Sequence, residues 1–341
     1  MQDKKRKSKY NIAVIGAGTW GAAIANLLAQ NGHIVSVYAR STIQVEIMSK
    51  KRTHSKLDGF KFDKSIFFTD DIEKAVSGKE IIIIAVPSIA FRDVAKQVVA
   101  YCKGDEYFVT LTKGMEDKTL FTMSEIIEDE LKKKKIKTNK IIALSGPTHA
   151  EEVVKNFPTT AVSAAKSLKV AKFIQDIFMN SNFRVYTNTD IKGVEVCAAF
   201  KNIIGIASGL VSGLGYGDNI KAAVITRGLA EMVRAGKVLR CKKDTFYGLA
   251  GLGDMVVTAT SINSRNYRCG VLIGKGYSPK TAISKIGMVV EGANFIPKAM
   301  KIKNKYNLYL PITTAMNEII YKDKNPKQMV NILMNRSKKS E

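Results

Sequence analysis

The sequence predicts an α/β protein with a doubly wound, mainly parallel sheet, followed by an all-helical C-terminal domain. Short apolar segments alternate with helical ones through the first 189 residues, and the first of them runs into a glycine-rich turn. From residue 190 onward the strand pattern disappears, and small residues with long helical periodicities replace it. Continuous apolar strands separated by helices are typical of a parallel sheet covered on both faces.

The first strand and its turn carry the most specific signal. The strand 11–15 leads into a G-x-G-x-x-G turn formed by Gly16, Gly18 and Gly21, and a helical run follows over 22–30. The first glycine permits a tight turn, the second lets a pyrophosphate approach the backbone, and the third lets helix and strand pack closely. Because the helix N-terminus also offers unpaired N–H groups to phosphate, we expect a Rossmann-type dinucleotide site rather than a turn kept for packing alone.

The remaining strands follow at intervals along the first domain, each short, apolar and mostly rich in β-branched residues. They are expected at 34–38, 81–86, 108–111, 141–145, 160–164 and 183–186, with a helix at 168–178 between the last two. We therefore expect a dinucleotide-binding domain at residues 1–189, whose first nine residues form a disordered basic tail. A helical substrate-binding domain is expected at residues 190–341.

Composition limits the classes of function. The chain has 341 residues, of which 45% are hydrophobic, a size that favours two domains. A formal net charge of +24 would favour nucleic acid as a partner, but the basic residues are dispersed and no binding motif interleaves aromatics with them. We expect no specific nucleic acid and no membrane insertion. The four cysteines have no metal-ligand spacing, which predicts reduced thiols, no metal site and a cytoplasmic protein.

Residues just after the strands are the first candidates for chemistry, since ligands of an open α/β sheet bind outside the carboxyl ends of its strands. Lys113 follows the strand 108–111, and the segment 146–151 follows the next strand. Lys113 is therefore placed where a cofactor and a substrate would meet, although an exposed loop lysine is the alternative. After the second strand stands Arg40, with no carboxylate nearby. Arginine can accept a 2′-phosphate, so we expect NADPH to be accepted, unless Arg40 is an ordinary surface residue.

A second lysine lies in the helical half. At helical spacing Lys201 shares its face with small and apolar residues, and no carboxylate stands three or four positions away. It either reaches solvent or meets a partner from elsewhere, and burial would lower its pKa toward the range useful for proton transfer. Further along, Asp254 begins an expected helix with Thr258 one turn on, and Ser264, Arg265 and Asn266 suit phosphate oxygens. Taken alone, Asp254 could be a helix N-cap and Arg265 a salt-bridge partner.

These motifs together resemble those of the bacterial NAD(P)-dependent glycerol-3-phosphate dehydrogenases, over residues 11 to 333. The matching stretches are IGAGTWG, VPS, TKGME, LSGPTHAEE, FRVYTNTD, GVE, AFKNIIGIASG, ITRGLAEM, GLAGLGDMVVT, SRN and KIGMVVEG. The resemblance implies a cytoplasmic homodimer that reduces dihydroxyacetone phosphate to sn-glycerol 3-phosphate, the backbone of phospholipids.

The resemblance also assigns roles to residues. It implies that the cofactor contacts Thr19, Trp20, Arg40, Lys113, Ala150, Arg265, Val289 and Glu291, in addition to the turn glycines. It implies that the substrate is held by Lys113, Gly146, Thr148, Lys201, Asp254, Ser264, Arg265 and Asn266. Lys201 would transfer the proton, with Lys113 and Asp254 positioning it. Relatives more often carry Ser where this chain has Thr19, and some carry His where it has Arg40, which leaves cofactor preference open.

Other readings of the same residues remain. A β-hydroxyacid or ketopantoate reductase would share the nucleotide turn and a catalytic lysine, but would need a carboxylate site instead of a phosphate site. A redox-sensing module would bind the dinucleotide without turning it over, which the set of Lys113, Lys201, Asp254 and Arg265 disfavours. A charge-driven nucleic-acid role would show only nonspecific, salt-sensitive binding.

Overall fold

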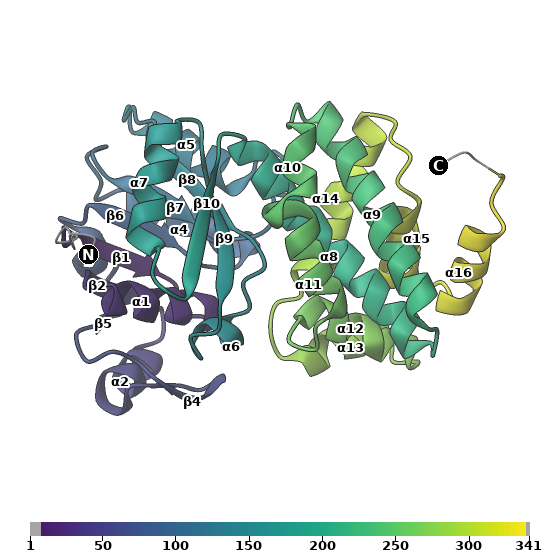
Figure 1. The fold of residues 1–341 in the computed structure, drawn as a ribbon, viewed down its shortest axis with the longest axis horizontal. Coiled ribbons are helices and arrows are strands. Elements are labelled where there is room, and N and C mark those ends of the chain that lie inside the picture. The colour runs from purple at the N-terminus through teal and green to yellow at the C-terminus, as the bar shows by residue number, and fades with distance from the viewer. Residues whose placement is uncertain (1–7, 339–341) are drawn as a thin grey trace.

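A computed structural model describes residues 8–338 and consists of an α/β half followed by a helical half (Figure 1). The α/β half contains an eight-stranded sheet in the order β10-β9-β8-β7-β6-β1-β2-β5. Its strands are β1 Asn11–Ile15, β2 Ile34–Tyr38, β5 Phe67–Thr69, β6 Ile81–Ile84, β7 Tyr107–Thr110, β8 Ile141–Ser145, β9 Thr159–Ala165 and β10 Phe183–Asn188. A separate hairpin pairs β3 Thr53–His54 with β4 Leu57–Lys61.

The eight-stranded sheet is parallel from β5 to β8, and the pairing of β8 with β9 is its one antiparallel pairing within residues 8–338. Strand β1 lies between β2 and β6, so the chain order reverses at its carboxyl end. In doubly wound sheets a ligand binds at such a reversal. The mainly parallel sheet that the sequence predicts is therefore confirmed, and β9 and β10 extend it as expected.

Helices cover both faces of the sheet, because successive residues of a strand point to opposite sides. Ile12 and Val14 face one core, and Ala13 and Ile15 face the other. The helices of this half are α1 Thr19–Gln30, α2 Thr42–Lys51, α3 Ile72–Val76, α4 Phe91–Val99, α5 Met123–Lys133, α6 Ala150–Val153 and α7 Leu168–Phe178. Helices α1 and α7 pack in the first core, whereas α3, α4 and α5 pack in the second.

The helical half is built around one long helix, α8, against which most of the other helices pack (Figure 1). Its helices are α8 Ile191–Gly213, α9 Asp218–Val238, α10 Lys243–Tyr247, α11 Asp254–Thr260, α12 Arg265–Gly274, α13 Pro279–Ile286, α14 Glu291–Lys305, α15 Pro311–Lys322 and α16 Pro326–Met334. Helices α8 and α12 approach so closely that a Cβ on Gly209 would lie 2.0 Å from the Tyr267 carbonyl oxygen. This contact explains why the sequence pattern here is rich in small residues.

Helix α8 is long and apolar enough to cross a bilayer, yet its apolar stretch is wholly buried inside the protein. It is a core helix of the helical half. The four cysteines are free, and the described residues contain no cluster of His, Cys, Asp or Glu suited to a metal ion. Residues 1–7 of the expected basic tail lie outside the described part of the chain.

The expected strand bounds agree with the structure where the strands are apolar. Strands β1, β2 and β8 have the expected limits, and the other expected strands differ by one or two residues at an end. Strands β3, β4 and β5 were not expected. Each has at most five residues, and β3 and β4 carry polar and glycine residues, so none shows a continuous apolar pattern.

Candidate active site

The glycine turn has the geometry that its spacing predicts. Gly16 has a φ of +113°, and a Cβ there would lie 2.6 Å from the Ala85 carbonyl oxygen. A Cβ on Gly21 would lie 2.0 Å from the Gly16 carbonyl oxygen, so any side chain would separate α1 from β1. A Cβ on Gly18, in contrast, would meet no described atom within 4 Å. The open side of Gly18 and the N-terminus of α1, which no side chain caps, fit the pyrophosphate of a dinucleotide.

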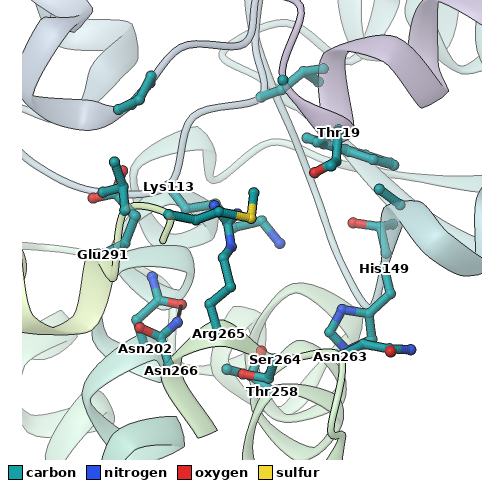
Figure 2. Close-up of a pocket in the computed structure, with 18 of the residues that line it drawn as sticks. Thr19, Lys113, His149, Asn202, Thr258, Asn263, Ser264, Arg265, Asn266 and Glu291 are labelled. Atoms are coloured by element: carbon teal, nitrogen blue, oxygen red, sulfur yellow. Dashed lines mark hydrogen bonds between the residues drawn. The ribbon is translucent and has the colours of Figure 1, made fainter. Parts of the chain in front are cut away.

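A cavity of about 510 Å³ adjoins this turn and lies between the two halves (Figure 2). It gathers most of the predicted site residues: Gly18, Thr19, Trp20, Gly21, Lys113, Thr148, Ala150, Lys201, Asp254, Ser264, Arg265, Asn266, Val289 and Glu291. Three predicted residues do not line it. Gly16 packs against the Ala85 backbone, Gly146 presents its carbonyl to Lys113, and Arg40 is exposed just after β2.

The chemical centre of the cavity is Lys201, whose side chain is buried. Its Nζ donates to Oδ1 of Asp254 at 2.5 Å and to Oγ1 of Thr258 at 2.7 Å. Asp254 is the first residue of α11 and Thr258 lies one turn later, so a single helix face supplies both acceptors. The partner that Lys201 lacks on its own helix therefore comes from a segment 53 residues away.

Lys113 completes this centre from the sheet edge. Its Nζ donates to Oδ2 of Asp254 at 2.8 Å and to the Gly146 carbonyl oxygen at 3.3 Å. One buried carboxylate thus joins two ammonium groups that come from opposite sides of the cavity. An ammonium has three donors, so each lysine retains one N–H for a ligand.

The protonation of these groups follows from their burial. Burial lowers the pKa of Lys201 to about 7, the Asp254 carboxylate opposes that shift, and the charge of Lys113 adds to it. Burial alone would raise the pKa of Asp254, but the two ammonium groups outweigh it and hold that pKa below its usual range. Lys201 can therefore exchange a proton near neutral pH while Asp254 stays ionised.

The SRN segment forms the N-terminus of α12 at one end of the cavity. The Ser264 hydroxyl caps this helix by accepting from the Tyr267 amide at 3.2 Å. Arg265 lines the cavity and forms no salt bridge within residues 8–338. The carboxylates of Glu291 and Glu151 act on its charge from a greater distance. A guanidinium without a direct salt-bridge partner beside a helix N-terminus suits a phosphate group.

Asn202 is a cavity residue that sequence reasoning missed. Its side-chain oxygen accepts from Nδ2 of Asn266 at 2.9 Å, and Oδ1 of Asn266 in turn accepts from the Gly292 amide at 2.9 Å (Figure 2). This chain of hydrogen bonds fixes Asn266 between α8 and α14. The sequence signal that could have identified Asn202 as a site residue is its position directly after Lys201.

Glu291 links the two halves beside the cavity. Its carboxylate accepts from the Ser88 amide at 3.0 Å and from the Ser88 hydroxyl at 2.6 Å. Ser88 belongs to the turn after β6, whereas Glu291 begins α14. Only the family resemblance singled out Glu291 from the sequence, since a contact between residues 203 positions apart leaves no local pattern.

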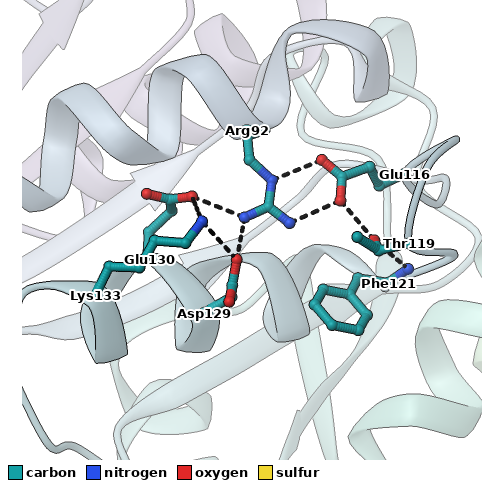
Figure 3. A network of polar contacts seen from close by, with 7 residues as sticks. All are labelled: Arg92, Glu116, Thr119, Phe121, Asp129, Glu130 and Lys133. Atoms are coloured by element: carbon teal, nitrogen blue, oxygen red, sulfur yellow. Dashed lines mark hydrogen bonds and ion pairs between the residues drawn. The ribbon is translucent and has the colours of Figure 1, made fainter.

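Arg92 of α4 binds Glu116, which lies on the same loop as Lys113 (Figure 3). The guanidinium donates to both carboxylate oxygens of Glu116, at 2.6 and 2.7 Å, and also to Asp129 and Glu130 of α5. Glu116 stands three residues after Lys113. A bidentate pair of this kind holds a loop in one geometry, and it was not visible in the sequence.

Two family models match the two halves of the chain. The family model described as NAD-dependent glycerol-3-phosphate dehydrogenase N-terminus matches residues 11–171, and the corresponding C-terminus model matches residues 190–331. A protein of Lactobacillus delbrueckii subsp. bulgaricus, named as a glycerol-3-phosphate dehydrogenase of the NAD(P)+ type, is 48% identical over 97% of this chain and 98% of its own length. A protein of Bacillus subtilis with the same type of name is 44% identical over 97% of this chain and 95% of its own length.

Solved structures show the same similarity. The crystal structure of glycerol-3-phosphate dehydrogenase from Coxiella burnetii superposes with a TM-score of 0.91 at 34% identity. The match covers 96% of this chain and 99% of that one, so it includes both halves and the cavity between them.

Proposed function

Because the chain belongs to the NAD-dependent glycerol-3-phosphate dehydrogenase family, we propose that it reduces dihydroxyacetone phosphate to sn-glycerol 3-phosphate with NAD(P)H, using Lys201 for proton transfer. The protein is an oxidoreductase that uses a nicotinamide dinucleotide. The observation that carries the proposed chemistry is the buried Lys201–Asp254–Lys113 group, which lies in one cavity with the glycine turn.

The bound dinucleotide supplies a hydride for the carbonyl carbon, and the residues of this chain supply the rest. The Lys201 ammonium protonates the carbonyl oxygen as it becomes an alkoxide, and leaves a neutral amine that regains a proton from solvent. Asp254 and Thr258 orient Lys201, and the charge of Asp254 stabilises its ammonium form. Lys113 directs its remaining N–H to the substrate and adds positive charge where negative charge develops. In the reverse direction the neutral amine removes the hydroxyl proton.

The substrate phosphate is assigned to the N-terminus of α12. Ser264, Arg265 and Asn266 line the cavity there, and Asn202 fixes Asn266. A guanidinium and helix N–H groups bind an anionic group such as a phosphate. They bind a carboxylate as well, so the choice of a phosphorylated substrate over the acids that β-hydroxyacid and ketopantoate reductases use rests on the family to which the chain belongs.

The remaining assignments concern the cofactor and the assembly. Residues 1–189 bind the dinucleotide and residues 190–341 complete the substrate site, with Arg40 beside the adenosine ribose, where it would accept NADPH. The exposed position of Arg40 after β2 supports this role. Three further assignments for the protein rest on the family resemblance: a homodimeric state, a cytoplasmic location and the use of its product for glycerophospholipids.

A direct assay tests the proposal. Purified protein with dihydroxyacetone phosphate should oxidise NADH or NADPH, as followed by absorbance, and should not oxidise them with 2-oxoacids or ketopantoate. Turnover of ketopantoate with no turnover of dihydroxyacetone phosphate would overturn the substrate assignment. Binding of the dinucleotide without turnover of any carbonyl compound would instead indicate a sensing module.

A further inference from the structure

His149 lies in the cavity, but nothing in the chemistry described so far uses it. It stands between β8 and α6, at the cap position of α6, and its side chain does not cap that helix. Figure 2 shows its imidazole projecting from the sheet edge toward the loop that carries Asn263 and Ser264. His149 thus reaches from the α/β half toward the phosphate end of the cavity.

The Nε2 atom of His149 is buried and has no hydrogen-bond partner within residues 8–338. A buried polar atom without a partner is uncommon, because the group has lost its hydration without compensation. The His149 side chain lines a ligand cavity instead of a sealed core, so a small rotation of the imidazole would bring this atom within reach of a ligand. A bound ligand would therefore supply the missing partner.

The surroundings of His149 select an anion as that ligand. Lys113, Lys201 and Arg265 line the same cavity, and the N-terminus of α12 is also positive. Burial lowers the pKa of His149, and the charges of Lys201 and Lys113 lower it further, while Glu151 and Glu152 oppose them. The imidazole is therefore neutral at neutral pH and can donate one N–H without adding a further full charge.

We propose that Nε2–H of His149 donates a hydrogen bond to the phosphate of the substrate, so that the phosphate is held from both halves of the protein. This inference rests on the proposed function and deepens it. The α12 residues bind the phosphate from the helical side, and His149 binds it from the sheet side. Substrate binding would then favour approach of the two halves around the cavity.

The test uses two variants of His149. His149→Phe keeps a ring of similar volume but has no donor, whereas His149→Gln places an amide N–H near the position of Nε2. For each enzyme we would measure kcat, KM for dihydroxyacetone phosphate, KM for NADH and the competitive inhibition constant of inorganic phosphate. Ionic strength is held constant with chloride, so that screening does not vary.

His149→Phe should raise KM for dihydroxyacetone phosphate and the inhibition constant of phosphate by about tenfold, the value of one charge-assisted hydrogen bond. Its kcat should stay within about twofold, because the bond is present in both ground and transition states. KM for NADH should not change, and His149→Gln should recover most of the loss. An unchanged inhibition constant of phosphate would overturn the proposal, as would a fall in kcat alone, which would place His149 at the carbonyl.

A turnover-independent measurement separates this inference from the proposed function. Phosphate should raise the Tm of the wild-type protein, and should raise that of His149→Phe much less. If the wild-type protein did not reduce dihydroxyacetone phosphate, the proposed function would fail, while the phosphate-dependent Tm would still decide the role of His149. A melting curve without phosphate shows whether each variant is folded.

Discussion

Asp254→Asn tests how the buried carboxylate controls Lys201. The substitution keeps the shape of the side chain but removes the charge that joins the two ammonium groups, whose Nζ atoms lie 2.5 and 2.8 Å from its oxygens. Unit charges about 4 Å apart interact by roughly 4 kcal/mol at an effective dielectric constant of about 20. Since one pKa unit corresponds to about 1.36 kcal/mol, a loss of even 2–3 kcal/mol would lower the pKa of Lys201 by roughly two units.

At pH 7 the Lys201 ammonium of Asp254→Asn would then be a minor species. We expect kcat/KM for dihydroxyacetone phosphate to fall ~50-fold at that pH, because the protonated fraction of Lys201 falls from about one half to about one hundredth. The descending limb of its pH profile should move from about 7 in the wild type toward about 5. Oxidation of sn-glycerol 3-phosphate needs the neutral amine, so it should be less impaired than reduction.

The assay is a pH series of initial rates at saturating NADH, with a melting curve for each protein. Asp58→Asn is the matched control, because Asp58 is an exposed carboxylate on β4 and its removal should leave rate and profile unchanged. A descending limb that stays in place in Asp254→Asn, with a loss below about threefold, would refute the electrostatic reasoning.

Three further outcomes are expected. In the wild type, reduction should slow and oxidation should accelerate as the pH rises through about 7, the lowered pKa of Lys201. Above this pKa the ammonium that reduction needs becomes scarce, and below it the neutral amine that oxidation needs becomes scarce. Parallel pH profiles in the two directions would contradict this. Arg265→Ala should raise KM for dihydroxyacetone phosphate at least ~10-fold, and unchanged substrate affinity would move the phosphate site elsewhere. Arg92→Gln should lower the free energy of unfolding by about 2 kcal/mol and raise KM for the substrate, since Glu116 and the Lys113 loop lose their anchor; a melting curve and a KM determination check both, and a lower Tm with wild-type KM would limit Arg92 to a structural role.

The local sequence pattern predicted the apolar strands and the glycine turn, because each depends on residues that are close together in the chain. A run of four β-branched residues such as Ile81–Ile84 favours a buried strand, as the structure shows. The spacing of Gly16, Gly18 and Gly21 matches two close backbone contacts, at Gly16 and Gly21, and one open side, at Gly18. The hairpin of β3 and β4 has no such run, because a polar, partly exposed pair of strands needs no continuous apolar pattern.

The sequence predicted most of the named residues that line the cavity, but it did not predict which of them contact one another. The apolar helix face of Lys201 left two alternatives, exposure to solvent or a partner from elsewhere, and the structure identifies Asp254 and Thr258 as its partners. Lys113 and Asp254 lie 141 positions apart, so no periodicity could pair them. Asn202 was missed for the same reason, since its partner Asn266 comes from a distant segment.

Chemical rescue of Lys201→Ala tests the role of this lysine most directly. The variant should bind NADH and dihydroxyacetone phosphate but lose roughly 10²- to 10⁴-fold in kcat, the usual contribution of a general acid. Small primary amines added to the assay should restore part of that turnover, with a rate that depends on the pKa of the amine, and should not accelerate the wild type. Near-normal turnover of Lys201→Ala without any amine would contradict the account.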